Sequence, residues 1–153
     1  MVKKAAFEAF RRLPDPLRRA TVHAVAPSYT VGAVAVLRRP DGRVVFVDQR
    51  HSGGWALPGG LLRRGEAAAE GLVREVCEEI GLDLQSTPLP VPLAAVSARV
   101  RRLDVVFVID VPDTVVARAA DAIEVRGVEW FSLDALPEVT DPTLEILRAV
   151  RLL

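Results

Sequence analysis

Three glutamates on one predicted helix are spaced so that they could bind a metal ion together. Residues 67–80 have the apolar periodicity of a helix, and Gly81 is suited to end it. The apolar side chains share one sector of the helical wheel: Ala69, Leu72, Val73, Val76 and Ile80. Glu75, Glu78 and Glu79 fall in the adjoining sector, because spacings of three and four residues return to one face. Clustered carboxylates suit Mg²⁺ or Mn²⁺, and the alternative is an ordinary solvated acidic face.

A glycine-containing loop directly precedes this helix. Residues 55–60 read Trp-Ala-Leu-Pro-Gly-Gly, so two glycines lie just ahead of the acidic segment. Glycine allows the backbone to approach a metal ion or a phosphate closely. The loop therefore favours a metal site over a solvated acidic face.

The segment from Gly60 to Leu82 resembles a complete Nudix box. That family's pattern is Gly, five residues, Glu, seven residues, then Arg-Glu-aliphatic-x-Glu-Glu-x-Gly-aliphatic, and every fixed position is filled. With ordinary residue usage, a chance match has a probability on the order of 10⁻⁹ per starting position. The resemblance implies a Nudix fold, in which a mixed β-sheet lies between α-helices. It also implies an enzyme that uses water to cleave a phosphoanhydride bond.

The resemblance further implies roles for individual residues. Four ligands are implied for Mg²⁺, with Mn²⁺ as a substitute: the side chains of Glu75, Glu78 and Glu79 and the backbone carbonyl of Gly59. Arg74 would orient the carboxylates by bidentate pairing, and Glu66 would brace the loop and Arg74. The general base differs among family members, being either a glutamate of the box or an outer acid, so the base stays unassigned.

Glu124 is the candidate for that outer acid. In many relatives it lies before a late strand that ends in an aromatic pair, and Glu124 precedes Trp130 and Phe131 by six residues. The other interpretation is an ordinary charged residue at the start of a strand. Asp104 and Asp121 are alternatives for the same role.

The substrate expected from the resemblance is a small nucleotide-like molecule. Nucleoside triphosphates and nucleoside diphosphates linked to another group both remain open. Arg50, Arg63 and Arg64 flank the box and could contact phosphates, although solvated loop charges are the alternative. A nucleotide-binding sensor without turnover is a second functional hypothesis, which the intact box disfavours.

The remaining pattern predicts one α+β domain at 28–153 behind a helical extension at 1–27. The extension consists of helices at 3–12 and 16–25, with Asp15 as N-cap, and serves packing or dimerisation. Strands are predicted at 29–37, 43–48, 93–100, 103–111 and 124–131. A helical turn at 132–136 and a final helix from Pro142 to the C-terminus complete the expected order.

Composition narrows the partners and the location. Twenty basic and twenty acidic residues give zero net charge, which gives no sign of nucleic-acid or membrane binding. Cys77 is the only cysteine, so no intrachain disulfide can form, and we expect a small buried thiol in a cytoplasmic protein. A homodimer is possible through the extension.

Overall fold

The computed structural model describes residues 2–153, with side chains from residue 6 onward. Met1, which the expected extension includes, lies outside the described residues. The helices are α1 (Val2–Arg12), α2 (Asp15–Val25), α3 (Ala68–Ile80), the short 3₁₀ helix η1 (Leu133–Ala135) and α4 (Asp141–Ala149). The strands are β1 (Thr30–Arg38), β2 (Val44–Gln49), β3 (Trp55–Ala56), β4 (Gly59–Leu61), β5 (Leu93–Ser97), β6 (Arg102–Asp110) and β7 (Val125–Phe131).

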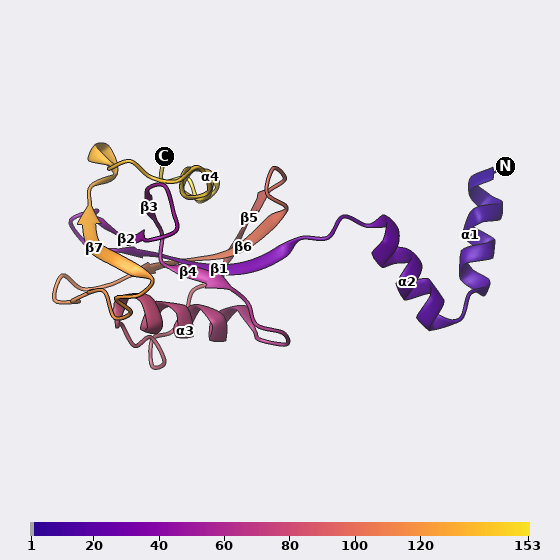
Figure 1. Cartoon of the computed structure of the whole chain (residues 1–153), viewed down its shortest axis with the longest axis horizontal. Helices are drawn as coiled ribbons and strands as arrows, with labels where there is room; N and C mark the ends of the chain where they lie inside the picture. Colours follow the sequence, from indigo (N-terminus) through magenta and orange to yellow (C-terminus); the bar gives the residue numbers. More distant parts are fainter. Residues whose placement is uncertain (1) are drawn as a thin grey trace.

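The strands form one mixed sheet of seven strands around β1. The main order is β3-β2-β1-β6-β5, while β4 pairs with β1 and β7 pairs with β2. β1 and β6 are parallel along their whole length, from Thr30 opposite Arg102 to Arg38 opposite Asp110. The β1–β2, β1–β4, β2–β7 and β5–β6 pairs are antiparallel. Figure 1 shows this sheet between α3 on one face and α4 on the other, which confirms the expected α+β Nudix architecture.

Alternating side chains of β1 fill two separate hydrophobic layers. Ala33, Ala35 and Leu37 belong to the layer that packs on α3. Val34 and Val36 point to the opposite layer, which packs on α4. Because strand residues alternate between faces and both faces are covered, β1 is an unbroken apolar run.

Helix α3 is placed by its own apolar stripe. Leu72, Val76 and Ile80 are fully buried against the sheet. Gly81 ends the helix in the left-handed conformation at φ 66°, as the sequence indicated, and its N–H donates to the carbonyl of Cys77. The flank of α3 beside the buried stripe is therefore fixed relative to the end of β2 and to β4.

Two short strands were missed by the sequence analysis. β3 and β4 lie in the segment that was expected to be only a glycine-rich loop. β4 is held by β1, with Ala33 opposite Gly60 and Val34 opposite Gly59. The final helix is also shorter than expected, because α4 ends at Ala149 rather than at the C-terminus.

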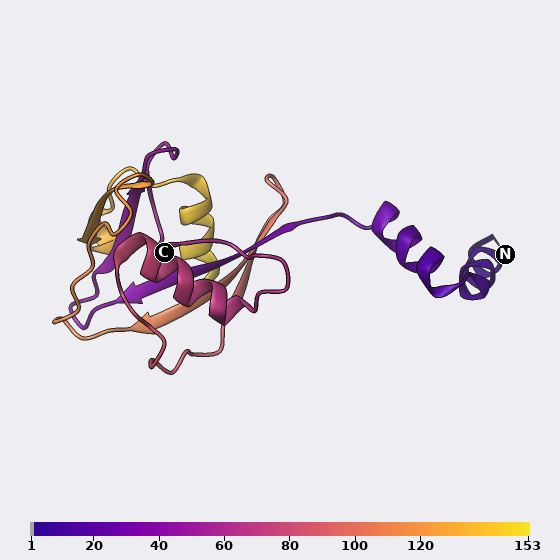
Figure 2. The same cartoon turned by 60° about the horizontal axis from the view of Figure 1, so that its bottom comes forward.

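The N-terminal helices extend away from the domain. Figures 1 and 2, which differ by a 60° rotation, both show α1 and α2 beyond the end of β1 and clear of the sheet. No residue of α2 is buried. The expected N-cap is wrong by one position: Pro14 precedes the helix without a side-chain cap, and Asp15 is the first helical residue, where it pairs with Arg18. Within the described residues, no helix is long and apolar enough to cross a membrane.

Candidate active site

Glu79 lies at the centre of the site and is held from two sides. Its Oε1 accepts a hydrogen bond from the side-chain amide of Gln49, at the end of β2, at 2.6 Å. Its Oε2 accepts from the backbone N–H of Gly59, at the start of β4, at 2.8 Å. The residue is only 5% exposed. Glu79 therefore joins helix α3, strand β2 and the glycine loop.

Burial raises the pKa of the Glu79 carboxyl to about 7. Loss of water disfavours the charged form, and the negative charges of Glu75 and Glu124 act in the same direction. The hydrogen bonds from Gly59 and Gln49 oppose this shift without cancelling it. A carboxyl group with this pKa exchanges a proton near neutral pH.

Arg74 connects the other glutamates of the box. Its Nε and Nη2 donate to the two carboxylate oxygens of Glu66 at 2.8 and 2.9 Å. Its Nη1 donates to Glu75 at 2.6 Å and to Glu78 at 3.1 Å. The geometry is the bidentate pairing that suits a planar guanidinium. One cation thus serves three carboxylates.

The Arg74 hydrogen bonds lower the pKa of the Glu66 carboxyl to about 2, and the backbone N–H of Arg63 adds to the effect. Glu66 raises the pKa of Arg74 in return. Glu66 Oε2 also accepts the Arg63 N–H at 2.8 Å, so this side chain fixes the loop before the helix. Glu66 is permanently charged at neutral pH and cannot exchange a proton there.

Two glycines allow the backbone to lie against these carboxylates. A Cβ on Gly60 would lie 2.5 Å from the carboxyl carbon of Glu75. Gly59 has a φ of 145°, and a Cβ there would overlap the backbone oxygen of Ala33. Both positions require glycine, because neighbouring protein atoms leave no space for a side chain.

The acidic side chains are not gathered around a single point. Among the described residues, no group of three or more His, Cys, Asp or Glu side chains is arranged to hold a metal ion. Glu75 and Glu78 contact Arg74 instead, and Glu78 also contacts Arg63 at 3.3 Å. Glu78 is half exposed, whereas Glu75 and Glu79 are largely buried. In this conformation Arg74 supplies the positive charge beside Glu75 and Glu78, whereas Glu79 is held by Gln49 and Gly59.

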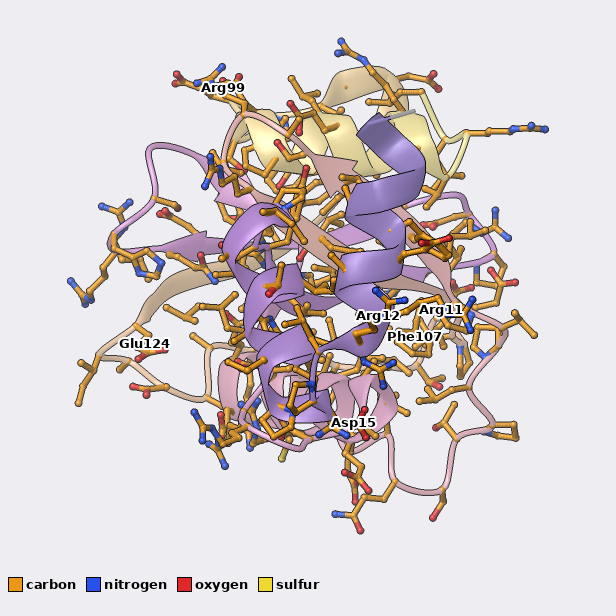
Figure 3. The ribbon with its side chains drawn as sticks, turned by 90° about the vertical axis from the view of Figure 1, so that its right-hand side faces the viewer. Arg11, Arg12, Asp15, Arg99, Phe107 and Glu124 are labelled. Carbon is orange, nitrogen blue, oxygen red and sulfur yellow. The ribbon has the colours of Figure 1, made fainter. Side chains whose placement is uncertain are left out.

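The remaining sequence candidates lie at different distances from this centre. Glu124 is exposed on the loop before β7, at the rim of the domain (Figure 3), and is near enough for its charge to raise the pKa of Glu79. Arg50 lies beside it, with its backbone N–H bonded to the Glu124 carbonyl and its Nε bonded to that of Ala122. Arg64 is exposed, and no side-chain hydrogen bond or ion pair of Arg64 is found within the described part of the chain. Asp121 instead accepts the backbone N–H of Ile123 within its own turn.

A cavity of about 270 Å³ lies on the α4 side of the sheet, next to the two residues that hold Glu79. Gln49 and Gly59, the two residues bonded to Glu79, both line it. Val34, Leu57 and Ile146 form its apolar wall. A small molecule bound in this cavity would therefore lie against Gln49 and Gly59, the two residues that hold Glu79.

Two of the sequence expectations concern residues beside the site. Cys77 is exposed, so the expected buried thiol is wrong. It lies one residue beyond buried Val76, about 100° further around the helix and outside the apolar stripe. Gln49 was missed altogether, and its signal was only a polar residue closing the apolar run of β2.

Comparisons with known proteins agree with this arrangement. The NUDIX domain model matches residues 28–150. A protein of Bacillus subtilis (strain 168), provisionally named an 8-oxo-dGTP diphosphatase, is 30% identical over 115 residues, which are 71% of this chain and 70% of that protein. A MutT-like protein of Streptomyces ambofaciens is 37% identical over 59 residues, 39% of this chain and 38% of its own length.

Solved structures show the same fold. The MutT NUDIX hydrolase of Burkholderia pseudomallei superposes with a TM-score of 0.67 at 26% identity, covering 80% of this chain and 98% of that one. A bifunctional NMN adenylyltransferase/ADP ribose pyrophosphatase of Francisella tularensis, complexed with AMP and a Mn ion, gives 0.68 at 21% identity. That match covers 88% of this chain and 44% of the other. With an intact box and a family match over most of its length, this chain belongs to the Nudix hydrolase family.

Proposed function

We propose that this chain catalyses the Mg²⁺-dependent hydrolysis of a phosphoanhydride bond in a nucleoside triphosphate or in a nucleoside diphosphate linked to another group. The observation that carries the proposal is Glu79, a buried carboxylate held between the glycine loop and β2, beside a cavity. A buried carboxylate with a raised pKa is typical of a catalytic site, and the two residues that hold Glu79 line the adjacent cavity.

The donor set supports a hard divalent cation. We assign its binding to the carboxylates of Glu75, Glu78 and Glu79 and to the backbone carbonyl of Gly59. All are oxygen ligands, which Mg²⁺ and Mn²⁺ prefer, and Gly59 already contacts Glu79 through its N–H. Burial raises the pKa of Glu79 most, and the charge of Glu75 adds a repulsion that a bound cation would relieve. When bound, a divalent ion neutralises phosphate oxygens and lowers the pKa of a water molecule.

The other residues of the box position these ligands. Arg74 holds Glu75 and Glu78 while Glu66 fixes the guanidinium, so a ligand entering the site meets carboxylates of defined orientation. Arg50, Arg63 and Arg64 are arginines of the surrounding loops and are assigned to the substrate phosphates. Their positive charges would attract a polyphosphate to an acidic centre that would otherwise repel it.

Removal of a proton from the attacking water falls to Glu79 or to Glu124. Glu79 has the matching pKa in the metal-free protein, whereas Glu124 is free to approach from the rim. The attack then proceeds in line on phosphorus, and no covalent enzyme intermediate is required. Cys77, on the opposite flank of α3, has no part in the reaction.

The proposal is tested by incubating the full chain with a panel of nucleoside triphosphates and nucleoside diphosphate derivatives in Mg²⁺, Mn²⁺ or EDTA. We expect turnover with either cation and none in EDTA, and mass analysis of the products identifies the bond that is broken. Glu75→Gln and Glu79→Gln are expected to lower kcat by about 10²-fold or more. Glu129→Gln, at an exposed position of β7, is the matched control.

Two results would contradict this function. Unchanged turnover by the Glu79→Gln variant would show that Glu79 is not required for catalysis. Tight binding of one nucleotide without turnover of any would favour the alternative, a sensor that binds nucleotides without cleaving them.

A further inference from the structure

A groove of about 690 Å³ lies between α3 and the loop that follows it. On its α3 side are Ala69, Val73 and Cys77, which are four residues apart and therefore lie in one row along the helix. Leu84 and Leu89 line the side formed by the loop. Ala69 and Cys77 are exposed, so this row is not covered by the rest of the described chain. The proposed function gives the groove no role.

Helix α2 presents an apolar stripe that also has no partner in its own domain. Side chains three and four residues apart share one sector of this helix: Leu17, Ala20, Thr21, Ala24 and Val25. The Thr21 hydroxyl donates to the Leu17 carbonyl at 2.8 Å, so it is satisfied within the helix and does not interrupt the stripe. No residue of α2 is buried. A stripe of this spacing is what an amphipathic helix uses to dock in an apolar groove.

The linker between α2 and β1 directs the helix away from its own domain. Residues 26–29 read Ala-Pro-Ser-Tyr. Proline fixes its own φ and keeps the residue before it extended, and Ala26 is extended at φ −78° and ψ 141°. Figures 1 and 2 both show α2 clear of α3. The stiff, extended linker therefore offers α2 to a second molecule.

The charges on the two surfaces are complementary. Arg18 and Arg19 lie outside the stripe of α2, which contains one acidic residue, Asp15. Arg19 is exposed and forms no ion pair within the part of the chain that the structure describes. At the groove, α3 carries four glutamates and one arginine. One of these glutamates, Glu70, is exposed at the edge of the groove, where it accepts the backbone N–H of Ala67 at 3.2 Å.

We propose that α2 of one molecule docks in the groove of a second copy of the same chain. The stripe from Leu17 to Val25 then packs against Ala69, Val73 and Cys77, and Arg19 faces Glu70. When two copies exchange α2 reciprocally, both stripes and both grooves are filled, and the assembly closes as a two-fold dimer. This inference is independent of the proposed hydrolytic function.

The first test uses Cys77, the only cysteine of the chain, as a probe inside the groove. The full wild-type chain is labelled with a maleimide at increasing protein concentrations, while light scattering gives the mass at each concentration. We expect Cys77 to react about tenfold or more slowly in the dimer, because the reaction then requires the release of α2. A labelling rate that stays constant while the mass doubles would overturn the inference, as would a monomer at every concentration.

A second cysteine locates the contact. Ala20→Cys and Ala24→Cys each place a thiol in the stripe, whereas His23→Cys, the matched control, places one on the side of α2 that faces α1. Under mild oxidation, we expect a stripe variant to form a covalent dimer joined through Cys77 of the other molecule. The control should not form it, because its thiol lies too far away for a disulfide. A disulfide to Cys77 within one chain would contradict the exchange, and so would covalent dimers that never include Cys77.

A third variant tests the groove by charge. Ala69→Arg fills the groove and repels the arginines of α2, so the dissociation constant of the dimer should rise about tenfold or more. Ala149→Arg, at an exposed position of α4 on the other face of the sheet, is the matched control and should leave it unchanged. An unchanged dissociation constant in Ala69→Arg would exclude this groove. The labelling of wild-type Cys77 needs no variant, so the inference can be refuted even if Ala69→Arg fails to fold.

Discussion

The side-chain amide of Gln49 donates to Oε1 of Glu79 at 2.6 Å and thereby ties the end of β2 to the acidic helix. The bond crosses 30 residues of sequence. It aligns the Glu79 carboxylate so that its second oxygen meets the Gly59 N–H. The carboxylate is held in place by neutral donors and has no cationic partner among the described residues, which is why burial dominates its pKa.

Glu79→Gln is expected to stabilise the metal-free protein at alkaline pH while lowering kcat by about 10²-fold or more. The folded state raises the pKa of Glu79 to about 7, so it binds a proton that the unfolded chain has already released. The free energy of unfolding therefore falls as pH rises from about 4.5 through 7. A shift of this size corresponds to about 3 kcal/mol. Urea unfolding in EDTA between pH 4 and pH 8.5 measures it.

The glutamine variant should lack this decline and exceed the wild-type stability above pH 7. At pH 4 the pH-dependent part of this difference should be smallest, because Glu79 is then mostly protonated in both states of the wild-type chain. Parallel stability profiles for the two proteins would show that Glu79 does not titrate as proposed.

Arg74→Lys is expected to destabilise the fold and to lower kcat/KM. Lysine keeps the charge but cannot bond both oxygens of Glu66 and also reach Glu75. Loss of charge-assisted hydrogen bonds at a largely buried site costs about 2 kcal/mol. Chemical unfolding and steady-state kinetics report the two effects separately.

Arg63→Lys is the control for this change. The Arg63 side chain is 65% exposed, and its contact with Glu78 is a long 3.3 Å. Its unfolding free energy should stay within about 0.5 kcal/mol of the wild-type value. Equal losses of unfolding free energy in Arg74→Lys and Arg63→Lys would mean that the hydrogen bonds of Arg74 have no special structural role.

Glu124→Gln is expected to separate catalysis from folding. The side chain is exposed on the rim, so its replacement should leave Tm unchanged. Loss of a general base lowers kcat by about 10²-fold or more, and the acidic limb of the pH–rate profile should disappear with it. An unchanged kcat and pH profile would transfer the proton-accepting role to Glu79.

The sequence predicted those parts of the site that lie on one continuous element. Glu75, Glu78 and Glu79 share a helix, so the periodicity of residues 67–80 alone was enough to place them on one flank. The strands of the core were predictable for the same reason, because β1 and β2 are long apolar runs.

The parts that were missed depend on contacts between distant segments. β4 has three residues, two of them glycine, and it is a strand only because β1 lies beside it. Gln49 meets Glu79, and Asp104 lies opposite Gly32, only through the sheet topology. Composition within a short window carries no information about such pairings.

Removal of residues 1–27 is expected to leave the domain folded and active. Both hydrophobic layers are built from residues of the domain, and α2 buries none of its side chains. Phe7, Leu17 and Val25 are 61%, 53% and 79% exposed, so the extension presents apolar surface that its own domain does not cover. Residues 1–25 carry six basic and two acidic side chains, whereas residues 26–153 carry fourteen and eighteen.

This opposite charge makes a second copy of the chain the partner that we expect for the extension. Light scattering should give the full chain a mass above that of the monomer, and added salt should lower that mass. The truncated chain should have the mass of a monomer. Arg11→Glu with Arg12→Glu, at the exposed end of α1 (Figure 3), should weaken the association without changing Tm or kcat/KM. A full chain that stays monomeric at high concentration and low salt would exclude self-association. A fall in Tm on truncation would instead show that the extension packs on its own domain.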